Sequence, residues 1–113
     1  MTAQAGTAGL FNPALPPSTQ QQIQWAVAAG TGDVITAVYP QTVVALEDGL
    51  CLSFRASAAN TLVNPTFWPD GLQGYPIVKT NLQALSAADI AGQGHEVMVR
   101  FNLANEVWVW VNR

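Results

Sequence analysis

The sequence predicts a mainly β fold: a single small antiparallel β-sandwich or barrel-like domain, preceded by an extended N-terminal arm and a short α-helix. Three observations favour this class. Short runs rich in β-branched and aromatic residues follow one another from position 33 onward, separated by turn residues. Several of these runs alternate apolar and polar residues with the two-residue period of a half-buried strand. The length of 113 residues suits one domain with a modest apolar core.

The N-terminal segment, residues 1–30, is predicted to lie outside the β domain of residues 31–113. Its first 17 residues end in a run with three prolines between positions 13 and 17, which removes backbone donors and forbids a helix. We therefore expect an extended arm there. A short helix is expected over residues 18–29, capped by a hydroxyl side chain at its start. Trp25 would lie on the polar face of that helix, so we expect another surface to cover it.

Five short strands are predicted between residues 33 and 80, each bounded by turn residues. The clearest has leucine or phenylalanine at every second position, as a half-buried strand requires. One turn of helix is expected near residues 86–89. The predicted strands cover residues 34–39, 43–46, 50–55, 66–68 and 76–79.

A β-hairpin at the C-terminal end is the strongest local signal. Its first strand, residues 97–101, alternates apolar and polar residues, and residues 102–105 form the loop. The return strand, residues 107–111, is apolar on both faces, with valines on one and Trp108 and Trp110 on the other. A strand of this kind is normally covered on both faces. We expect the second cover to come from the helix or from a neighbouring chain.

The composition excludes several classes of protein. Half of the residues are hydrophobic and only 10% are charged, which is far from the composition of a disordered chain. The four cationic residues are scattered and outnumbered by seven acidic ones, so no nucleic-acid surface is expected. The apolar runs are too short for membrane insertion, and the first ten residues lack the features of a secretory signal. The surplus of apolar residues instead suggests a surface buried against a partner subunit.

No catalytic, cofactor-binding or metal site is predicted. A metal site needs three or four ligands, and the chain has one histidine and one cysteine. Cys51 and His95 could in principle form a nucleophilic pair, but Cys51 lies within a predicted strand, where an inert side chain is expected. The glycine pairs at 30–32 and 92–94 lack the third glycine of a dinucleotide-binding motif. The sequence thus indicates a protein that is not an enzyme.

The aromatic residues allow two interpretations. Trp68, Tyr75, Trp108 and Trp110 could form a platform on which sugars stack, because such rings offer an apolar face and a polar tip. They could equally belong to the core or to a subunit contact. In a chain this short we favour the second interpretation, and exposure of Trp68 and Tyr75 in a groove would favour the first.

The order of short segments along residues 33–112 resembles the small β-domain that recurs in tail-fibre and host-specificity proteins of tailed bacteriophages and prophages. The resemblance covers about two thirds of the chain and depends on shared order more than on any one motif. The segments are DVITAVYP at 33–40, ALEDGL at 45–50, FRA at 54–56, ANT at 59–61, NPTFWPDGL at 64–72, IVK at 77–79, ALSAADIAG at 84–92 and RFNLAN at 100–105, before a final strand that contains tryptophan.

The resemblance implies a virion structural module with no catalytic residues to carry over. We expect a homotrimeric tail fibre or tail-fibre attachment subunit, made in the host bacterial cytoplasm and docked on other tail proteins, such as an adaptor or baseplate, through residues 1–30. Fibres of this family are usually much longer, so a short fibre, an adaptor or the front of a longer fibre is expected. The expected subunit or partner contacts are Phe11, Pro13, Leu15, Trp25, Trp68, Trp108 and Trp110.

Two alternatives stay open at this point. One is a carbohydrate-binding module that contacts host surface glycan through exposed aromatic rings. The other is a capsid decoration or head-fibre protein, since a compact β unit could also sit on a shell.

Overall fold

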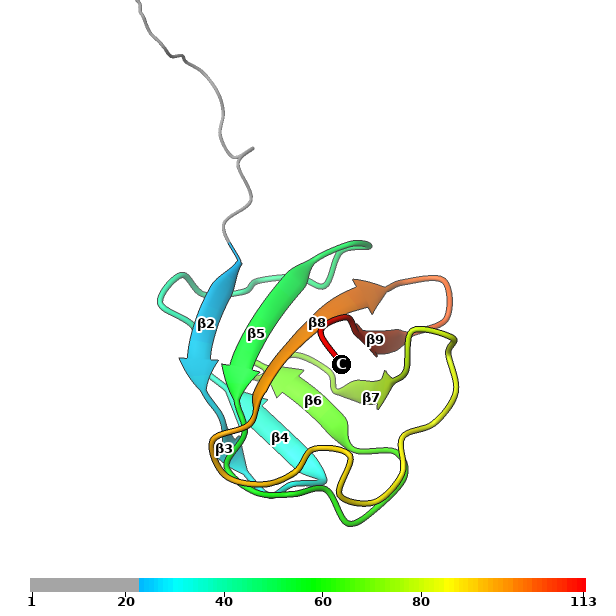
Figure 1. Ribbon diagram of the computed structural model, residues 1–113. Coiled ribbons are helices and arrows are strands. Elements are labelled where there is room, and N and C mark those ends of the chain that lie inside the picture. The colour runs from blue at the N-terminus through cyan, green and yellow to red at the C-terminus, as the bar shows by residue number, and fades with distance from the viewer. Residues whose placement is uncertain (1–22) are drawn as a thin grey trace, which may run out of the picture.

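The computed structural model describes residues 23–113, and this part of the chain is built from β-strands and loops without a helix (Figure 1). None of these residues therefore forms a helix that could cross a membrane. The mainly β, barrel-like class predicted from the sequence is confirmed. The strands are β2 (Gln24–Val27), β3 (Ala29–Gly30), β4 (Val34–Ala37), β5 (Cys51–Arg55), β6 (Thr66–Pro69), β7 (Tyr75–Val78), β8 (Glu96–Asn102) and β9 (Val107–Trp110).

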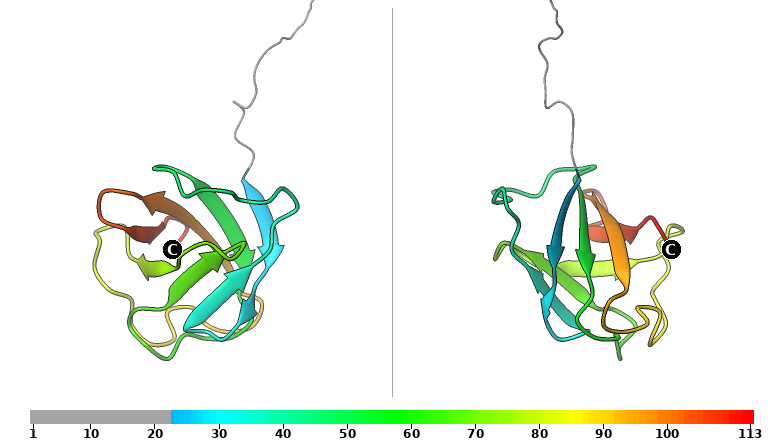
Figure 2. Two further views of the ribbon diagram at one scale, coloured as in Figure 1. Left: turned by 180° about the vertical axis from the view of Figure 1, so that it is seen from behind. Right: turned by 60° about the vertical axis from the view of Figure 1, so that its left-hand side comes forward.

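One stretch of chain, residues 24–30, nearly closes the sheet into a barrel. The strand order is β2-β5-β8-β9-β7-β6-β4-β3, so the two outermost strands are β2 and β3. These two strands are consecutive in sequence and separated only by Ala28. β2 pairs in parallel with β5, whereas β3 pairs antiparallel with β4. Figures 1 and 2 show the resulting curled sheet, with β2 and β3 joining its two ends.

The predicted helix is wrong for residues 24–29, which belong to β2, β3 and the residue between them. Trp25 and Val27 are exposed, while Ala26 and Ala28, which alternate with them, are buried, and this is the alternation of a strand. The local sequence is rich in alanine and so is compatible with a helix, but pairing with β5 and β4 decides the outcome. The remainder of the predicted helix, residues 18–22, and the predicted arm lie outside the described residues.

Most of the predicted strands are confirmed within a residue or two of their expected ends. β5, β6, β7 and the β8–β9 hairpin coincide with the predicted runs. The prediction of a strand at residues 43–46 is wrong, because this segment forms an irregular connection in which Val43 is buried and Val44 is exposed. The Val43 N–H donates to the Asp70 carboxylate (2.7 Å) instead of to a neighbouring strand. The expected helical turn near residues 86–89 is a single turn closed from Asp89 N–H to the Ser86 carbonyl.

Strand pairing is mixed, where the sequence predicts a purely antiparallel arrangement. β5 with β8, β8 with β9, β6 with β7 and β3 with β4 are antiparallel. β2 with β5, β4 with β6 and β7 with β9 are parallel. Each parallel pair joins strands that are separated by at least one other strand in the sequence. Such pairings depend on how the barrel closes, and no local alternation of residues predicts them.

Aromatic rings fill the interior of the barrel. Phe67 is fully buried, stacked on Phe54 (ring centroids 4.9 Å apart) and edge-on to Trp108 (5.1 Å). Phe101 then contacts both Trp108 (5.0 Å) and Tyr75 (5.5 Å), so five strands contribute to one aromatic cluster. The first two contacts are the stacked and edge-to-face arrangements that aromatic pairs prefer, and the two contacts of Phe101 are tilted.

The strand that is apolar on both faces, β9, is covered on both faces by its own chain. Trp108, Val109 and Trp110 are all buried, with at most 4% of their surface exposed. The expectation that a helix or a neighbouring chain supplies the second cover is therefore wrong. The reason is that the chain closes into a barrel in which Trp108 packs on Phe67 and Phe101 and Trp110 lies edge-on to His95, and a strand pattern alone cannot reveal this.

Asn60 is a buried polar side chain that organises two loops, and all of its principal hydrogen-bonding groups have partners. Its Nδ2 donates to the carbonyls of Leu62 (2.7 Å) and Ser86 (3.0 Å). Its Oδ1 accepts from the N–H of the fully buried Ile90 (2.9 Å). The side chain therefore ties the loop after β5 to the loop before β8, because buried polar groups must be paired.

We expect Asn60→Ala to lower the free energy of unfolding by about 2 kcal/mol, because it leaves the buried Ile90 N–H without an acceptor. Urea denaturation measures this change. Asn105→Ala is the matched control, since Asn105 is exposed at the β8–β9 turn and should change stability by less than about 0.5 kcal/mol. Equal effects of the two substitutions would contradict the role assigned to Asn60.

Candidate functional site

Cys51 and His95, the two side chains that could form a nucleophilic pair, lie far apart in the structure. Cys51 pairs with Arg100 at one end of the β5–β8 ladder, whereas His95 precedes Glu96 at the other end. Four to five strand residues separate them, which corresponds to roughly 15 Å. His95 also uses its Nδ1 to accept the Ala91 N–H (2.9 Å). The nucleophilic pair considered from the sequence is therefore not formed, and no group of three potential metal ligands occurs within residues 23–113.

The predicted contact residues fall into three groups. Trp108 and Trp110 are buried inside the barrel of a single chain and are not available as surface contacts. Phe11, Pro13 and Leu15 lie outside the described residues. Trp25 is 43% exposed and Trp68 is half-buried, so these two tryptophans alone among the described candidates reach the surface.

Trp25 is held on the outside of the barrel by two charged side chains. Its indole N–H donates to Glu96 Oε1 (2.8 Å), and the Arg55 guanidinium lies 4.9 Å from the centre of its ring. Arg55 Nε donates in turn to Glu96 Oε2 (2.9 Å). These three residues connect β2, β5 and β8 across the outer surface. Trp25 thus has a structural role at the strand that closes the barrel, through hydrogen bonding and a cation–π contact.

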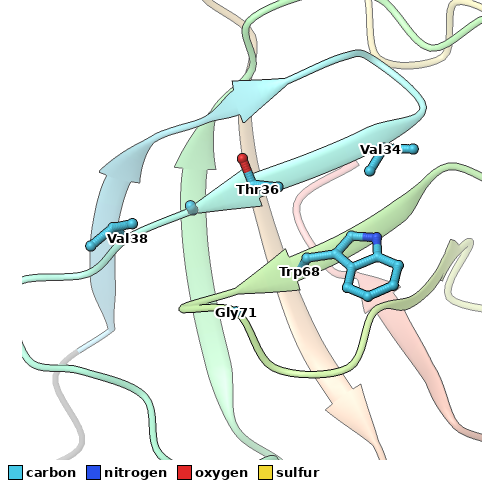
Figure 3. Close-up of a pocket in the computed structure, with 6 residues that line it drawn as sticks. Val34, Thr36, Val38, Trp68 and Gly71 are labelled. Carbon is cyan, nitrogen blue, oxygen red and sulfur yellow. The ribbon is translucent and has the colours of Figure 1, made fainter.

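Trp68 borders an open pocket of about 420 Å³ on the outer surface of β4 and β6 (Figure 3). The indole lies beside Val34, and the hydroxyl of Thr36 is the polar side-chain group at the rim. The parallel register places Thr36 next to Trp68. The full lining consists of Val34, Thr36, Ala37, Val38, Trp68 and Gly71.

The position of the Trp68 ring is fixed on two sides. Its N–H donates to Thr66 Oγ1 (2.8 Å), so the polar group of the indole is already satisfied. Gly74 lies directly against the ring, and a Cβ at that position would overlap the indole atoms. The absence of a side chain at Gly74 therefore allows the Trp68 indole to pack directly against the backbone of Gly74. The ring is a preformed apolar wall of the pocket.

Val38 is exposed over 79% of its surface although the backbone on either side of it is held firmly. On one side, the Ala37 carbonyl accepts the Asp70 N–H (2.8 Å). On the other, the Tyr39 N–H donates to Asp70 Oδ1 (3.2 Å), and the buried Tyr39 hydroxyl donates to the Ser53 carbonyl (2.9 Å). Burial raises the pKa of Tyr39, and the nearby Asp70 carboxylate raises it further. Val38 is thus a large apolar side chain presented to solvent on a rigid support.

These features combine into one apolar surface, which we call the outer face: Val27, Val34, Val38 and Trp68. Pairing of Ala29 with Thr36 places Val27 beside Val38 when the same register is continued. Val27 and Val34 are 58% and 48% exposed. The strands β3, β4 and β6 contain no charged residue. Exposed apolar surface of this kind, on ordered strands, is typical of an interaction site.

Sequence analysis identified Trp68 on this face but missed the valines. The signal was present, because Val34, Thr36 and Val38 occupy every second position and must share one side of a strand. Nothing in the alternation shows which side is buried, however. The inner side holds Ile35 and Ala37, so the larger set of branched side chains faces solvent.

Neither a scan of protein-family models nor a search of curated proteins finds a match to this chain. The outer face is therefore interpreted from its own chemistry. The pocket that borders it offers apolar area and the hydroxyl group of Thr36, and its lining holds no carboxylate or amide side chain that could hydrogen-bond a sugar. The outer face is suited to burial against another apolar surface.

Glu96 makes the stability of the folded barrel depend on pH. Hydrogen bonds from the Trp25 indole and from Arg55 hold the pKa of Glu96 below its ordinary value of 4.5. A carboxyl with a lowered pKa in the folded state stabilises the protein above the ordinary pKa, and this contribution is lost as the pH falls through the folded pKa. We expect Glu96→Gln to lower the Tm at neutral pH and to reduce the fall in Tm between about pH 5 and pH 3.

Thermal unfolding followed by circular dichroism across that pH range tests the prediction. Glu106→Gln serves as control, because Glu106 is exposed at the β8–β9 turn, and it should leave the profile unchanged. Part of the acid dependence should persist in the Glu96 variant. The pKa of Asp33 is lowered by the Thr61 hydroxyl, and that of Asp89 by the Ser86 N–H. An unchanged profile in Glu96→Gln would refute the role of the Trp25 contact.

Proposed function

We propose that this chain is a non-enzymatic structural subunit of a tailed-phage virion, a tail fibre or tail-fibre attachment subunit that assembles as a homotrimer. The observation that carries the proposal is the outer face, where exposed valines and Trp68 lie on uncharged strands of a rigid barrel. The subunit acts by shape and by burial of apolar surface. The order of segments that resembles tail-fibre domains provides the virion context.

Burial of the outer face favours association. A fully exposed valine that becomes fully buried contributes about 1.5 kcal/mol, so Val27, Val34 and Val38, which are 48–79% exposed, each contribute part of that amount. The indole of Trp68 adds apolar area. No charged side chain of β3, β4 or β6 has to be desolvated in this contact. Rigid support reduces the entropy that is lost on binding, since the Asp70 carboxylate already orders the segment around Val38.

In this proposal, docking on the rest of the tail is the task of the residues that precede β2. Residues 24–30 close the barrel, so the docking segment is shorter than the 30 residues expected from the sequence. The barrel then supplies the contacts among copies, and the preceding residues supply the contact to an adaptor or baseplate protein.

Recognition of host glycan is a weaker candidate for the same surface. The half-buried ring of Trp68 in a pocket is the feature that favours it. A sugar site also needs several polar groups that fix the orientation of the hydroxyls. The lining offers the Thr36 hydroxyl, and the indole N–H is already bonded to Thr66. Tyr75 packs against Phe101 in the core cluster instead of extending the pocket.

The association is tested by measuring mass in solution with light scattering over a range of concentrations. We expect a species of three times the 12.0 kDa chain mass. Val38→Lys should shift the equilibrium to single chains, because it places a charge in the buried contact. Leu103→Lys is the matched control, since Leu103 is also exposed (52%) but lies at the β8–β9 turn. A single-chain mass for the unaltered protein at every concentration would overturn the homotrimer.

The virion context is tested by mass spectrometry of particles from the phage or prophage that encodes the chain. We expect the chain in purified tails, at a copy number that is a multiple of three. Recovery with tail-free heads would instead identify a capsid decoration or head-fibre protein, and absence from virions would refute a structural role in the particle.

A further inference from the structure

The pocket beside Trp68 is suited to an uncharged, proline-rich peptide. Its walls are the indole face and the side chains of Val34 and Val38, and its rim carries a single hydroxyl (Figure 3). Proline-rich segments in the polyproline II conformation dock in grooves lined by aromatic rings, and their preformed backbone loses little entropy on binding. An open apolar pocket with one flat tryptophan wall has this character.

The chain carries such a peptide in its own N-terminal segment. Residues 11–17 read FNPALPP, in which Pro13 and Pro16 have the P-x-x-P spacing of polyproline II ligands. The first charged residue of the whole chain is Asp33, so this segment is uncharged throughout. An uncharged ligand suits an uncharged pocket, because binding does not remove water from a charged group on either partner.

The chain also enters the barrel at the side of the pocket. Gln24 Nε2 donates to the Gln41 carbonyl, and the Gln41 N–H donates to Gln24 Oε1, both at 2.8 Å. The start of β2 therefore lies beside residue 41, three positions beyond the pocket residue Val38. Counting strand residues and strand spacings from there gives about 20 Å to Trp68.

That distance lies within reach of residues 11–17. Six residue steps separate Pro17 from Ile23, and they span at most about 20 Å. Pro13 is four steps further along and reaches up to about 33 Å. A tether whose length matches the span gives a high effective concentration, in the millimolar range for short linkers. The same segment of a neighbouring copy, at ordinary protein concentrations, is present at a lower concentration than this effective concentration.

We propose that in the unassembled subunit residues 11–17 of the same chain occupy the pocket formed by Val34, Val38 and Trp68. This inference goes beyond the proposed function and does not depend on it. Where copies do associate through the outer face, the neighbouring copy and residues 11–17 compete for one surface.

A disulfide trap in the full-length chain tests the proposal. In a Cys51→Ser background, one variant carries Asn12→Cys with Thr36→Cys, which is on the pocket lining, so that both prolines and the apolar walls are kept. The matched control carries Asn12→Cys with Leu103→Cys, at an exposed position outside the pocket. We expect the first pair to form an intramolecular disulfide about tenfold faster than the control at micromolar concentration, as judged by non-reducing gels and intact mass.

The outcomes separate the possible occupants. Faster intramolecular closure of the pocket pair supports the proposal. Disulfides that link two chains would assign the pocket to the N-terminal segment of a second copy, and equal rates in both pairs would leave the segment without a preferred site; either result overturns the proposal. Because the reaction runs on dilute single chains, it gives its answer even if the light-scattering measurement finds no homotrimer. Circular dichroism of the reduced variants verifies that the barrel is folded.

Discussion

The architecture depends on the double pairing of residues 24–30. One edge of this segment bonds to β5 in parallel and its continuation bonds to β4 antiparallel, so the same stretch of chain occupies both ends of the sheet. Without it the sheet would expose two unpaired edges, which are templates for aggregation. The inward positions of the segment, Ala26 and Ala28, are small, and the larger rings of the core fill the space that remains. Closure also fixes where the preceding chain begins, beside residue 41 and close to the outer face.

The many apolar residues of the sequence are divided between the interior of the barrel and the outer face. Trp108 and Trp110 belong to the interior of the barrel, where Trp108 contacts Phe67 and Phe101. The outer face uses β-branched side chains and one tryptophan on strands without charge. The strand that is apolar on both sides thus belongs to the core of the barrel of a single chain. The exposed apolar side chains Val34 and Val38 lie in and just after β4, whose sequence pattern does not distinguish it from other strands.

Sequence reasoning succeeded where local alternation and burial agree. Residues 50–55 and the C-terminal hairpin were predicted correctly, because Leu52, Phe54 and Val99 alternate with polar neighbours and face the core. It failed at residues 24–30, where alanines and a four-residue apolar spacing suit a helix equally well and only pairing with distant strands decides. For the candidate site it found Trp68, but it could not tell the solvent side of residues 34–38 from the core side, since both sides carry apolar residues. Sequence reasoning also did not predict the parallel strand pairs, because closure of the barrel sets them.

The distribution of charge along the chain has a consequence for how contacts respond to ionic strength. The first charged side chain is Asp33, and its carboxylate accepts hydrogen bonds from the backbone N–H groups of Thr61 and Leu62 (2.8 Å each). The side chains of the outer face, Val27, Val34, Val38 and Trp68, are all neutral. Salt weakens attraction between charges by screening, but it leaves apolar burial intact or strengthens it. An association through the outer face would therefore keep its strength as the salt concentration rises, whereas an association through ion pairs would weaken.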